Sequence, residues 1–403
     1  MFNRLSKTVI ISGGGTCGHI IPALTVAEIL LGKGYRVLFV TDTKFDNYAQ
    51  HFQSIISSPS FNIVRVKSNY TPSMISRLLS IFKLLSNIVK ISRIILKYNV
   101  SVVAGFGGFV SISSVIAGFL TFRKCVIHEQ NACLGFANRV SAIFSSVILL
   151  GFPDTYGIPR IGKGKYIFVG NPVSQALKKM HYKNNIDAIN YEAFFKIHDK
   201  ISIVIVGGSQ GATILGDEVA HALCDLPMNV KKKLTIHHQC RASDVDKILS
   251  IYNDKELYAD VRSFFADLPS VLSGAHIFIG RSGAGAISDI TTLGVPSILV
   301  PFAKAANNHQ FKNAQYLYKN GACVLIDETD FSCKKLTGML TVLLKDERGL
   351  FEMSENAKKL CVINASSKIA LIVDRLRDAK SVDDFAELSA VDASRLINDV
   401  GIG

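Results

Sequence analysis

The sequence lacks closely spaced cysteine pairs. Its eight cysteines are scattered over 403 residues, and no two of them form a C-x-x-C motif. Disulfide-rich secreted domains and structural zinc sites both need cysteines at short, regular spacings. The pattern therefore excludes a disulfide framework and a zinc site, and it favours reduced thiols in a cytosolic protein.

Acidic residues are also few. Lys and Arg number 45 and Asp and Glu 32, which gives a formal net charge of +13. Such an excess favours an anionic partner: a nucleic acid, a phosphorylated ligand or an acidic membrane face. With 48% hydrophobic and 19% charged residues the chain is a folded globular protein, and its length predicts two domains.

Long hydrophobic segments are nearly absent. The N-terminal apolar run is too short for the core of a signal peptide. Residues 100–122 carry no charge and are long enough to cross a bilayer, but glycines, serines and a threonine interrupt them. We predict a buried strand from Val100 to Ala104, a glycine turn and a buried helix there, rather than a membrane span.

Two glycine-rich loops follow apolar strands on a repeated plan. Residues 8–11 lead into SGGGTCGH at 12–19, and residues 201–206 run into GGSQGA at 207–212. A strand, a glycine turn and a helix together form an anion-binding seat, because glycines let the backbone approach a ligand and the N–H groups of the first helical turn face it. The repetition predicts two Rossmann-like halves.

The first loop also fits the dinucleotide-binding pattern G-x-G-x-x-G through Gly13, Gly15 and Gly18. The next predicted strand ends at Asp42, close to the position at which that fold holds its ribose-binding carboxylate. An NAD(P)-dependent oxidoreductase is therefore an open alternative. His19 counts against it, because a dinucleotide loop has no use for an imidazole beside the pyrophosphate.

The most specific segment is residues 277–313. An apolar strand leads into Arg-Ser-Gly-Ala at 281–284, and a helix-like segment that carries Asp289 follows. His309 and Gln310 come after a second apolar run, at the carboxyl edge where α/β sheets bind ligands. In that helix a carboxylate could accept hydrogen bonds from two neighbouring sugar hydroxyls.

This segment resembles the donor-binding segment of the MurG family of bacterial glycosyltransferases. The first loop resembles the family through Thr16, Gly18, His19 and Pro22, and HEQN at 128–131 resembles it as well. The matches in the most specific segment are Arg281-Ser282-Gly283-Ala284, Ser288-Asp289, Gly294-Val295-Pro296, Val300-Pro301-Phe302, His309-Gln310 and Asn313-Ala314.

The resemblance implies an α/β protein of the GT-B architecture, with two Rossmann-like domains whose parallel sheets face a cleft. The expected domains are residues 1–170, which face the acceptor and the membrane, and residues 171–365, which bind the UDP-sugar. The chain would bend near Gly170 to Ser174. Residues 366–403 would form a C-terminal helix that returns to the first domain, plus a tail.

The implied activity is that of an inverting hexosyltransferase. It would move N-acetylglucosamine from UDP-N-acetylglucosamine to the C4 hydroxyl of N-acetylmuramic acid in lipid I, giving lipid II for peptidoglycan synthesis. The implied partners are these two substrates and the anionic surface of the bacterial inner membrane, with no nucleic acid and no cofactor. The protein would then lie peripherally on the cytoplasmic face. A non-catalytic binder of polyprenyl-phosphate lipid is a further alternative.

The implied site residues come from both halves. His19 is the candidate catalytic base, because an imidazole titrates near neutral pH, and a purely positional role is the alternative. Arg281 and the helix that starts near Ser282 would offset the charge of the departing UDP. The substrate-binding candidates are Thr16, Cys17, Gly18, Asn131, Ser174, Ser209, Phe265, Arg281, Ala284, Gly285, Ala286, Ile287, Ser288, Asp289, His309 and Gln310.

Three positions depart from the family pattern. Cys17 replaces a glycine, which would cost about 1–2 kcal/mol if that position needed a positive φ. Ser174 stands where an arginine commonly contacts the donor, and a hydroxyl cannot replace its charge-assisted bonds, although Lys178 or Lys179 could. Asp289 replaces a glutamate and reaches less far towards the ribose.

Two further patterns bear on metals and membranes. Asp244-Val245-Asp246 imitates the metal-binding DxD motif, but residues two apart on a helix point about 200° apart, so no metal is expected. Residues 75–98 are apolar and basic without an acid. They predict either a buried helix with a solvated basic stripe or a membrane face, and the resemblance favours the latter. The stripe, within an arc of about 80°, comprises Lys83, Lys90, Arg93 and Lys97.

Overall fold

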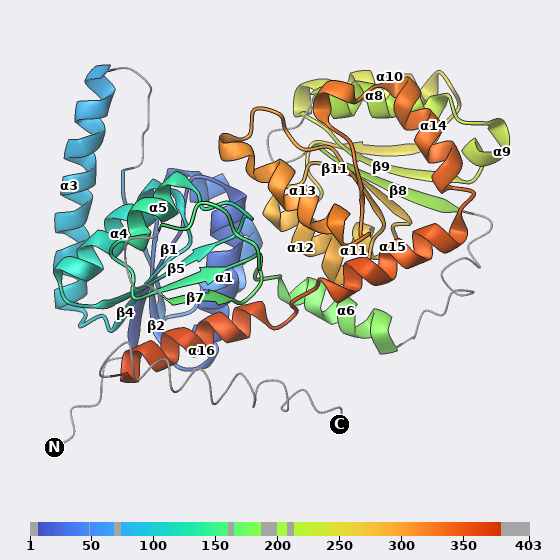
Figure 1. Cartoon of the computed structure of the whole chain (residues 1–403). Helices are drawn as coiled ribbons and strands as arrows, with labels where there is room; N and C mark the ends of the chain where they lie inside the picture. Colours follow the sequence, from blue (N-terminus) through green and yellow to red (C-terminus); the bar gives the residue numbers. More distant parts are fainter. Residues whose placement is uncertain are drawn as a thin grey trace.

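Two parallel β-sheets, each covered by helices on both faces, make up the protein (Figure 1). The computed structural model describes residues 7–47, 49–67, 74–159, 165–186, 200–207 and 213–379. Because both faces of each sheet are covered, the strands read as continuous apolar runs rather than as alternating patterns. The predicted fold class, two Rossmann-like α/β units in the GT-B arrangement, is confirmed.

The first unit contains a seven-stranded sheet in the order β3-β2-β1-β4-β5-β6-β7. Its strands are β1 (Thr8–Ser12), β2 (Arg36–Thr41), β3 (Phe61–Arg65), β4 (Val102–Gly105), β5 (Lys124–Glu129), β6 (Val147–Leu150) and β7 (Lys165–Phe168). Its helices are α1 (Cys17–Gly32), α2 (Gln53–Ile56), α3 (Met74–Lys97), α4 (Gly108–Leu120) and α5 (Phe136–Ala142).

The second unit contains a six-stranded sheet in the order β10-β9-β8-β11-β12-β13. Its strands are β8 (Ile201–Val206), β9 (Leu234–Gln239), β10 (Ala259–Arg262), β11 (Ile277–Gly280), β12 (Ser297–Leu299) and β13 (Val324–Leu325). Its helices are α6 (Gln175–Ile186), α8 (Thr213–Cys224), α9 (Met228–Lys231), α10 (Val245–Asn253), α11 (Leu268–Ser273), α12 (Ala284–Leu293), α13 (His309–Lys319), α14 (Cys333–Leu343) and α15 (Glu347–Lys359).

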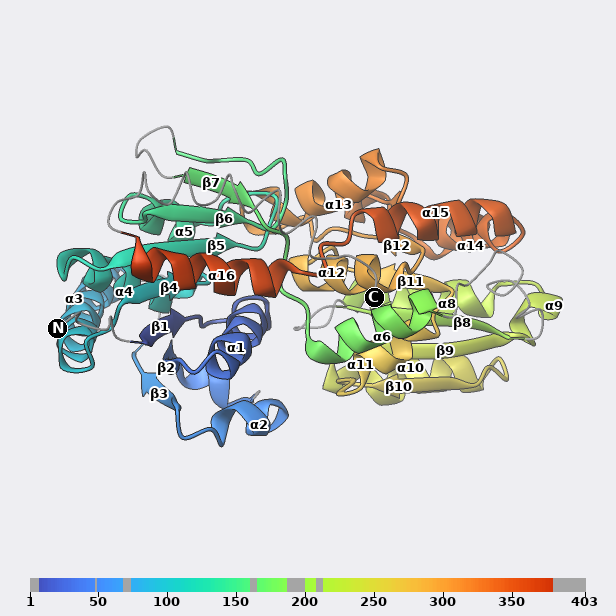
Figure 2. The ribbon, with the colours of Figure 1, turned by 90° about the horizontal axis from the view of Figure 1, so that it is seen from below.

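The last described helix, α16 (Ala365–Asp378), returns to the first unit. It packs against α1 and lies across that unit in Figure 2. Its apolar face joins the core that α1 and the sheet form, and the hydroxyl of Tyr35 donates a hydrogen bond to Asp374. The predicted return of this helix is therefore present, whereas residues 380–403 lie outside the described part of the chain.

Both sheets reverse their strand order beside their first strand. β1 lies between β2 and β4, and β8 lies between β9 and β11, all of them parallel. The loops that leave β1 and β4 at the carboxyl edge therefore diverge to opposite faces of the sheet, as do those that leave β8 and β11. This divergence opens the crevice in which α/β sheets bind ligands.

Three predicted boundaries need correction. Pro22 is typical of a first helical turn and predicts a helix from Pro22 to Leu31, but α1 begins at Cys17, so Pro22 lies in its interior and the helix tolerates the missing N–H. Residues 261–265 read as the end of a strand, but β10 ends at Arg262, which leaves Phe265 in the loop beyond it. The strand predicted from Val100 to Ala104 is β4, which starts at Val102 and ends at Gly105. None of the helices in the described ranges combines the length and the hydrophobicity that a bilayer crossing needs.

Candidate active site

The imidazole of His19 is held in one orientation by the loop that precedes it. Its Nδ1 lies 3.0 Å from the carbonyl oxygen of Gly14 and 3.3 Å from Oγ1 of Thr16. Because a carbonyl can only accept, Nδ1 carries the proton, and the lone pair is left on Nε2. The ring lies against Gly107, where an added Cβ would come within 2.9 Å of Nε2. His19 thus lies at the carboxyl edge of the first sheet with an unprotonated Nε2.

Cys17 fits the glycine-rich loop without strain. It is the first residue of α1, and the positive φ in this loop belongs to Gly15, at +86°. The strain considered for a side chain at position 17 therefore does not arise. Thr16 and Gly18, on either side, are exposed to solvent.

Asp42 does not serve as a ribose-binding carboxylate. Its side chain is only 2% exposed, and its Oδ1 accepts a hydrogen bond from the backbone N–H of Lys44 at 3.1 Å. A Cβ on Gly14 would lie 3.2 Å from Oδ2, so the carboxylate is packed behind the glycine loop. The dinucleotide alternative loses the residue on which it depends.

In the second unit, the two predicted ligand loops leave neighbouring strands. The backbone N–H of Arg281 donates to the carbonyl of Val206 at 3.3 Å, which places the end of β11 beside the end of β8. Ser209 itself falls outside the described residues. The loop that carries Ser209 nevertheless starts next to the loop that leads into α12.

The N-terminus of α12 offers donors to a ligand. Among the described residues, added Cβ atoms on Gly283 and Gly285 would meet nothing within 4 Å. The N–H groups of the first turn, from Ala284, Gly285 and Ala286, have no acceptor within the helix, and an anion is favoured at such a helix end. Ile287 and Ser288 are buried, and the Ser288 hydroxyl donates back to the carbonyl of Ala284 at 2.8 Å.

The guanidinium of Arg281 is engaged within the protein. Its guanidinium pairs with Glu328, donates to the carbonyl of Val300 at 3.0 Å and lies 5.3 Å from the ring centre of Phe302. The second oxygen of Glu328 accepts from the backbone N–H of Ala303 at 2.6 Å. The pair thus fastens the loop after β12. Sequence reasoning missed Glu328, because no motif surrounds it.

Asp289 is the unpaired acid of the site. It makes no hydrogen bond or ion pair with any residue of the described ranges, and burial raises the pKa of its carboxyl to about 7. A partly buried carboxylate without a partner gains most from hydroxyl donors supplied by a ligand.

The start of α13 lies beside this helix. The Ser282 hydroxyl donates to the Gln310 carbonyl at 2.8 Å, and the backbone N–H of Phe302 donates to Gln310 Oε1 at 2.9 Å. The Gln310 amide is therefore oriented by the loop that Glu328 fastens. The neighbouring His309 uses Nδ1 for the carbonyl of Ala306 at 2.8 Å.

Three other candidates are engaged within the protein. Ser174 caps α6, accepting from the backbone N–H of Leu177 at 3.3 Å. Phe265 is 2% exposed, beneath the guanidinium of Arg262 at 5.0 Å. Asn131 is hydrogen-bonded on both sides, to Glu129 and to Asn313.

The polar run after β5 has a structural role at His128 and Glu129. His128 Nε2 donates to the carbonyl of Gly170 at 2.9 Å, and burial lowers the pKa of this imidazole to about 4. Glu129 accepts from the backbone N–H groups of Asn131 and Gly135. Their adjacency at the end of a strand favours a hydrogen-bonded pair between them, but each side chain instead bonds to a different neighbouring segment.

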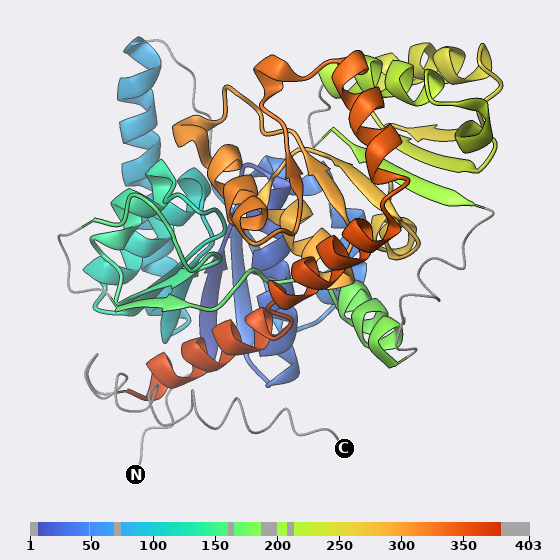
Figure 3. The same ribbon diagram turned by 45° about the vertical axis from the view of Figure 1, so that its right-hand side comes forward.

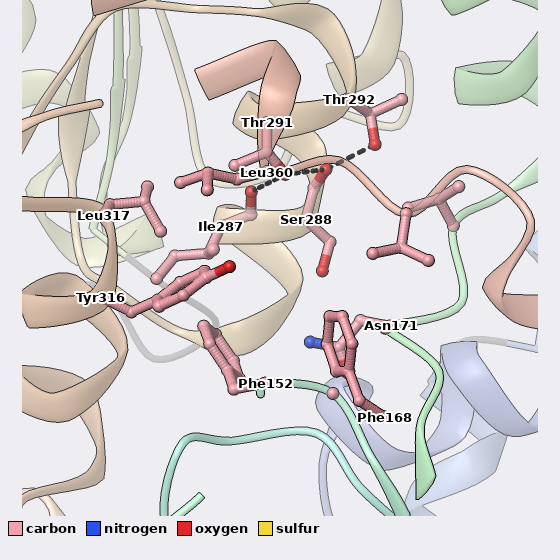
Figure 4. Close-up of a pocket in the computed structure, with 14 residues that line it drawn as sticks. Phe152, Phe168, Asn171, Ile287, Ser288, Thr291, Thr292, Tyr316, Leu317 and Leu360 are labelled. Carbon is pink, nitrogen blue, oxygen red and sulfur yellow. Dashed lines mark hydrogen bonds between the residues drawn. The ribbon is translucent and has the colours of Figure 1, made fainter. Parts of the chain in front are cut away.

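A hollow between the units lies behind α12 (Figure 4). Phe152, Phe168 and Asn171 line it from the first unit and the connection, and Ser288 and Thr291 line it from α12. Among the described residues, His19 is not one of those that line it. The hollow therefore lies between the units and apart from the His19 loop.

The predicted basic stripe lies on the outer side of the first unit. Lys90, Arg93 and Lys97 are exposed, and Lys83 is half-buried. In Figure 1, α3 stands on the side of the first unit that faces away from the second unit, and Figure 3 shows it at the upper left, rising above the other helices of the first unit. In the described ranges, no group of three or more His, Cys, Asp or Glu side chains could hold a metal ion. Asp244 and Asp246 therefore belong to no such group.

Comparisons with known proteins cover most of the chain. Residues 9–149 match the glycosyltransferase family 28 N-terminal domain, and residues 202–375 match the glycosyltransferase family 28 C-terminal domain. A solved structure titled as MurG of Acinetobacter baumannii has a TM-score of 0.70 and 27% identity, and the match covers 91% of this chain and 99% of that one.

Two curated relatives carry the same name, UDP-N-acetylglucosamine--N-acetylmuramyl-(pentapeptide) pyrophosphoryl-undecaprenol N-acetylglucosamine transferase. The one from Anaplasma marginale is 31% identical over 372 residues, 92% of this chain and 99% of the relative. The one from Wolbachia sp. subsp. Brugia malayi is 30% identical over 368 residues, 91% and 98% of the two chains.

Proposed function

The chain belongs to glycosyltransferase family 28, and from this membership we propose that it transfers N-acetylglucosamine from UDP-N-acetylglucosamine to the C4 hydroxyl of N-acetylmuramic acid in lipid I, giving lipid II with inversion at the sugar. One structural observation supports the proposal most strongly. Asn313 of α13 bonds to the backbone of Ala132, so the carboxyl edges of the two sheets, which carry the His19 loop and the start of α12, face each other.

The chemistry divides between the two edges. The free N–H groups at the start of α12 stabilise the negative charge that develops on the departing UDP. Nε2 of His19 takes the proton of the attacking hydroxyl, since Nδ1 is already committed to Gly14. Asp289 accepts from the ribose hydroxyls, and Gln310 contacts the sugar. This division needs neither a metal nor a cofactor.

Transfer itself tests the proposal. Purified protein is incubated with labelled UDP-N-acetylglucosamine and a soluble lipid I analogue, and the product is identified by mass. We expect a disaccharide product that depends on the acceptor. Hydrolysis of the donor at the same rate with and without acceptor, and no disaccharide, would contradict the proposed function.

Donor binding should depend on pH through Asp289. Burial holds the pKa of this carboxyl at about 7, and only the ionised form accepts two ribose hydroxyls. The affinity for UDP should therefore fall as the pH drops below 7, and the loss should approach about tenfold for each pH unit. The stability of the ligand-free protein should depend on pH in the opposite direction. Because the pKa of Asp289 is raised in the folded state, the free energy of unfolding should fall as the pH rises from 4 to 7.

Isothermal titration of UDP from pH 5.5 to 8.5 measures this dependence. The Asp289→Asn variant is the control, because UDP's own phosphate titration affects both proteins equally. We expect the difference between the two profiles to rise with pH and to level off above 7. Parallel profiles would show that Asp289 does not contact the ligand.

We also propose that the first unit binds an anionic membrane surface peripherally, on the cytoplasmic face of the bacterial inner membrane. On α3, exposed apolar side chains occupy an arc of about 100° directly beside the basic stripe. Helix α4 lies between α3 and α5, and Phe122 beyond its end and Phe136 on α5 are exposed as well. The exposed apolar residues on α3 include Ile81, Phe82, Leu85 and Val89.

Charge reversal of this surface should release the protein from vesicles. Each basic residue near an anionic bilayer contributes about 1 kcal/mol, so the double variant Arg93→Glu, Lys97→Glu should weaken binding by well over about tenfold. Sedimentation with vesicles of anionic and of zwitterionic lipid measures the effect. The matched control, Lys232→Glu with Lys255→Glu in the second unit, should bind as the wild type does; equal losses would place the contact elsewhere.

A further inference from the structure

The side chain of Asn313 joins the two halves of the site. It is completely buried, and its Oδ1 accepts from the backbone N–H of Ala132 at 2.7 Å. Its Nδ2 donates to the carbonyl of Ser282 at 3.0 Å and to Oδ1 of Asn131 at 3.1 Å. Ser282 leads into α12, whereas Asn131 and Ala132 follow β5. One amide thus ties the loop before the proposed donor helix to the first unit.

The hydrogen-bonded chain continues into the first unit. Asn131 donates to Oε1 of Glu129 through its backbone N–H at 3.0 Å and through Nδ2 at 3.1 Å. The other oxygen of Glu129 accepts from the backbone N–H of Gly135 and from Nδ2 of Asn138, both at 2.9 Å. Gly135 is the residue before α5. Glu129 therefore holds the loop of residues 130–135 at Asn131 and at Gly135, and Asn313 holds it at Asn131 and Ala132.

Only a carboxamide can fill the position of Asn313. It must present one acceptor to an N–H group and two donors to oxygen atoms, and no other side chain of that size offers both. A carboxylate would keep the bond to Ala132 but would set oxygen against the oxygens of Ser282 and Asn131. Because these groups are buried, the lost bonds cannot be replaced by water.

We propose that Asn313 is a positioning residue that couples occupation of the donor site to the loop of residues 130–135 in the first unit. The proposal rests on the proposed function for the identity of the donor. A UDP-sugar on the first turn of α12 fixes the Ser282–Gly283 peptide, and the Ser282 carbonyl then holds the Asn313 amide in the orientation that binds Ala132 and Asn131. By linkage, an acceptor that orders this loop also strengthens donor binding.

Hydrogen exchange with and without UDP tests the coupling. In the wild-type protein we expect UDP to slow exchange both in residues 283–287, where it binds, and in residues 130–138, which it does not touch. In Asn313→Asp the protection at 283–287 should persist, whereas the protection at 130–138 should fall by about fivefold or more, within the usual range of coupling between sites. Gln315→Glu, the same amide-to-acid change on the same helix, should behave as the wild type does.

Steady-state kinetics adds a readout that a merely structural role would not move. Asn313→Asp should raise KM for the lipid I analogue by about fivefold, the factor expected for the loss of protection, while the Kd for UDP changes little. Should Asn313→Asp fail to fold, Asn131→Ala removes the side-chain bonds of Asn131 to Asn313 and to Glu129 and leaves the bond between Asn313 and Ala132 in place. We expect the same selective loss in that variant.

The outcomes separate the coupling from the proposed function. Undiminished UDP protection of residues 130–138 in the variants overturns the coupling, as does an equal loss at both segments together with a lower Tm. UDP binding by the wild type without any protection at 130–138 also overturns it. A wild-type protein that binds no UDP refutes the proposed function itself.

Discussion

Replacing His19 with alanine should lower kcat by about 10²–10⁴-fold, the usual contribution of a general base. The Kd for UDP should stay unchanged, because the proposed donor contacts lie in the second unit. His19 presents Nε2 as the free base only because Nδ1–H is bound to the Gly14 carbonyl. Transfer kinetics together with titration of UDP separates the two quantities.

A second variant distinguishes the base from a positional role. In His19→Asn the side-chain amide can still donate to the Gly14 carbonyl, but the variant carries no basic nitrogen. If His19 acts as the base, asparagine should be as slow as alanine. If its role is positional, asparagine should restore most of the rate, and that result would remove His19 from the chemistry.

Replacing Glu328 with alanine should cost the second unit about 3 kcal/mol of unfolding free energy, since it leaves a buried guanidinium without its partner. Arg281 and Glu328 have side-chain exposures of 7% and 16%, so water can replace little of the lost interaction. The variant should also release the backbone of Ala303 and, through it, the loop that orients Gln310. Urea unfolding followed by far-UV circular dichroism gives the free energy.

The exposed pair of Arg348 and Glu352 is the control. Its side chains are 82% and 60% exposed, so Glu352→Ala should cost less than about 1 kcal/mol. The double variant Arg281→Met, Glu328→Leu should recover much of the stability, because it removes both buried charges together. Equal costs for Glu328→Ala and Glu352→Ala would show that the buried pair does not fasten the loop.

Local patterns in the sequence predicted the strands and the loops well. Strand β8 begins and ends where its apolar run does, and the loops after β1 and β11 carry glycines where the backbone turns sharply or meets open space. These features depend on neighbouring residues alone. The same dependence explains why Pro22, which is typical of a first helical turn, predicts a start of α1 that is five residues late.

The partners of polar side chains could not be predicted in this way. Arg281 was expected to meet a diphosphate, but the fold brings Glu328 to it from 47 positions further along the chain. Asn131 was expected to reach a sugar, and its amide is instead held by Asn313, 182 positions away. Such pairs depend on how the two sheets are placed, and no periodicity or motif in a single sequence records that placement.

A crystal structure with UDP-N-acetylglucosamine bound would test most directly whether the two carboxyl edges form a single site. The account predicts the diphosphate on the N–H groups that begin α12, the ribose hydroxyls on Asp289, and the anomeric carbon of the sugar facing the side of Nε2 of His19. A nucleotide seated instead on the loop of Gly13 to Gly18, with the start of α12 empty, would contradict it.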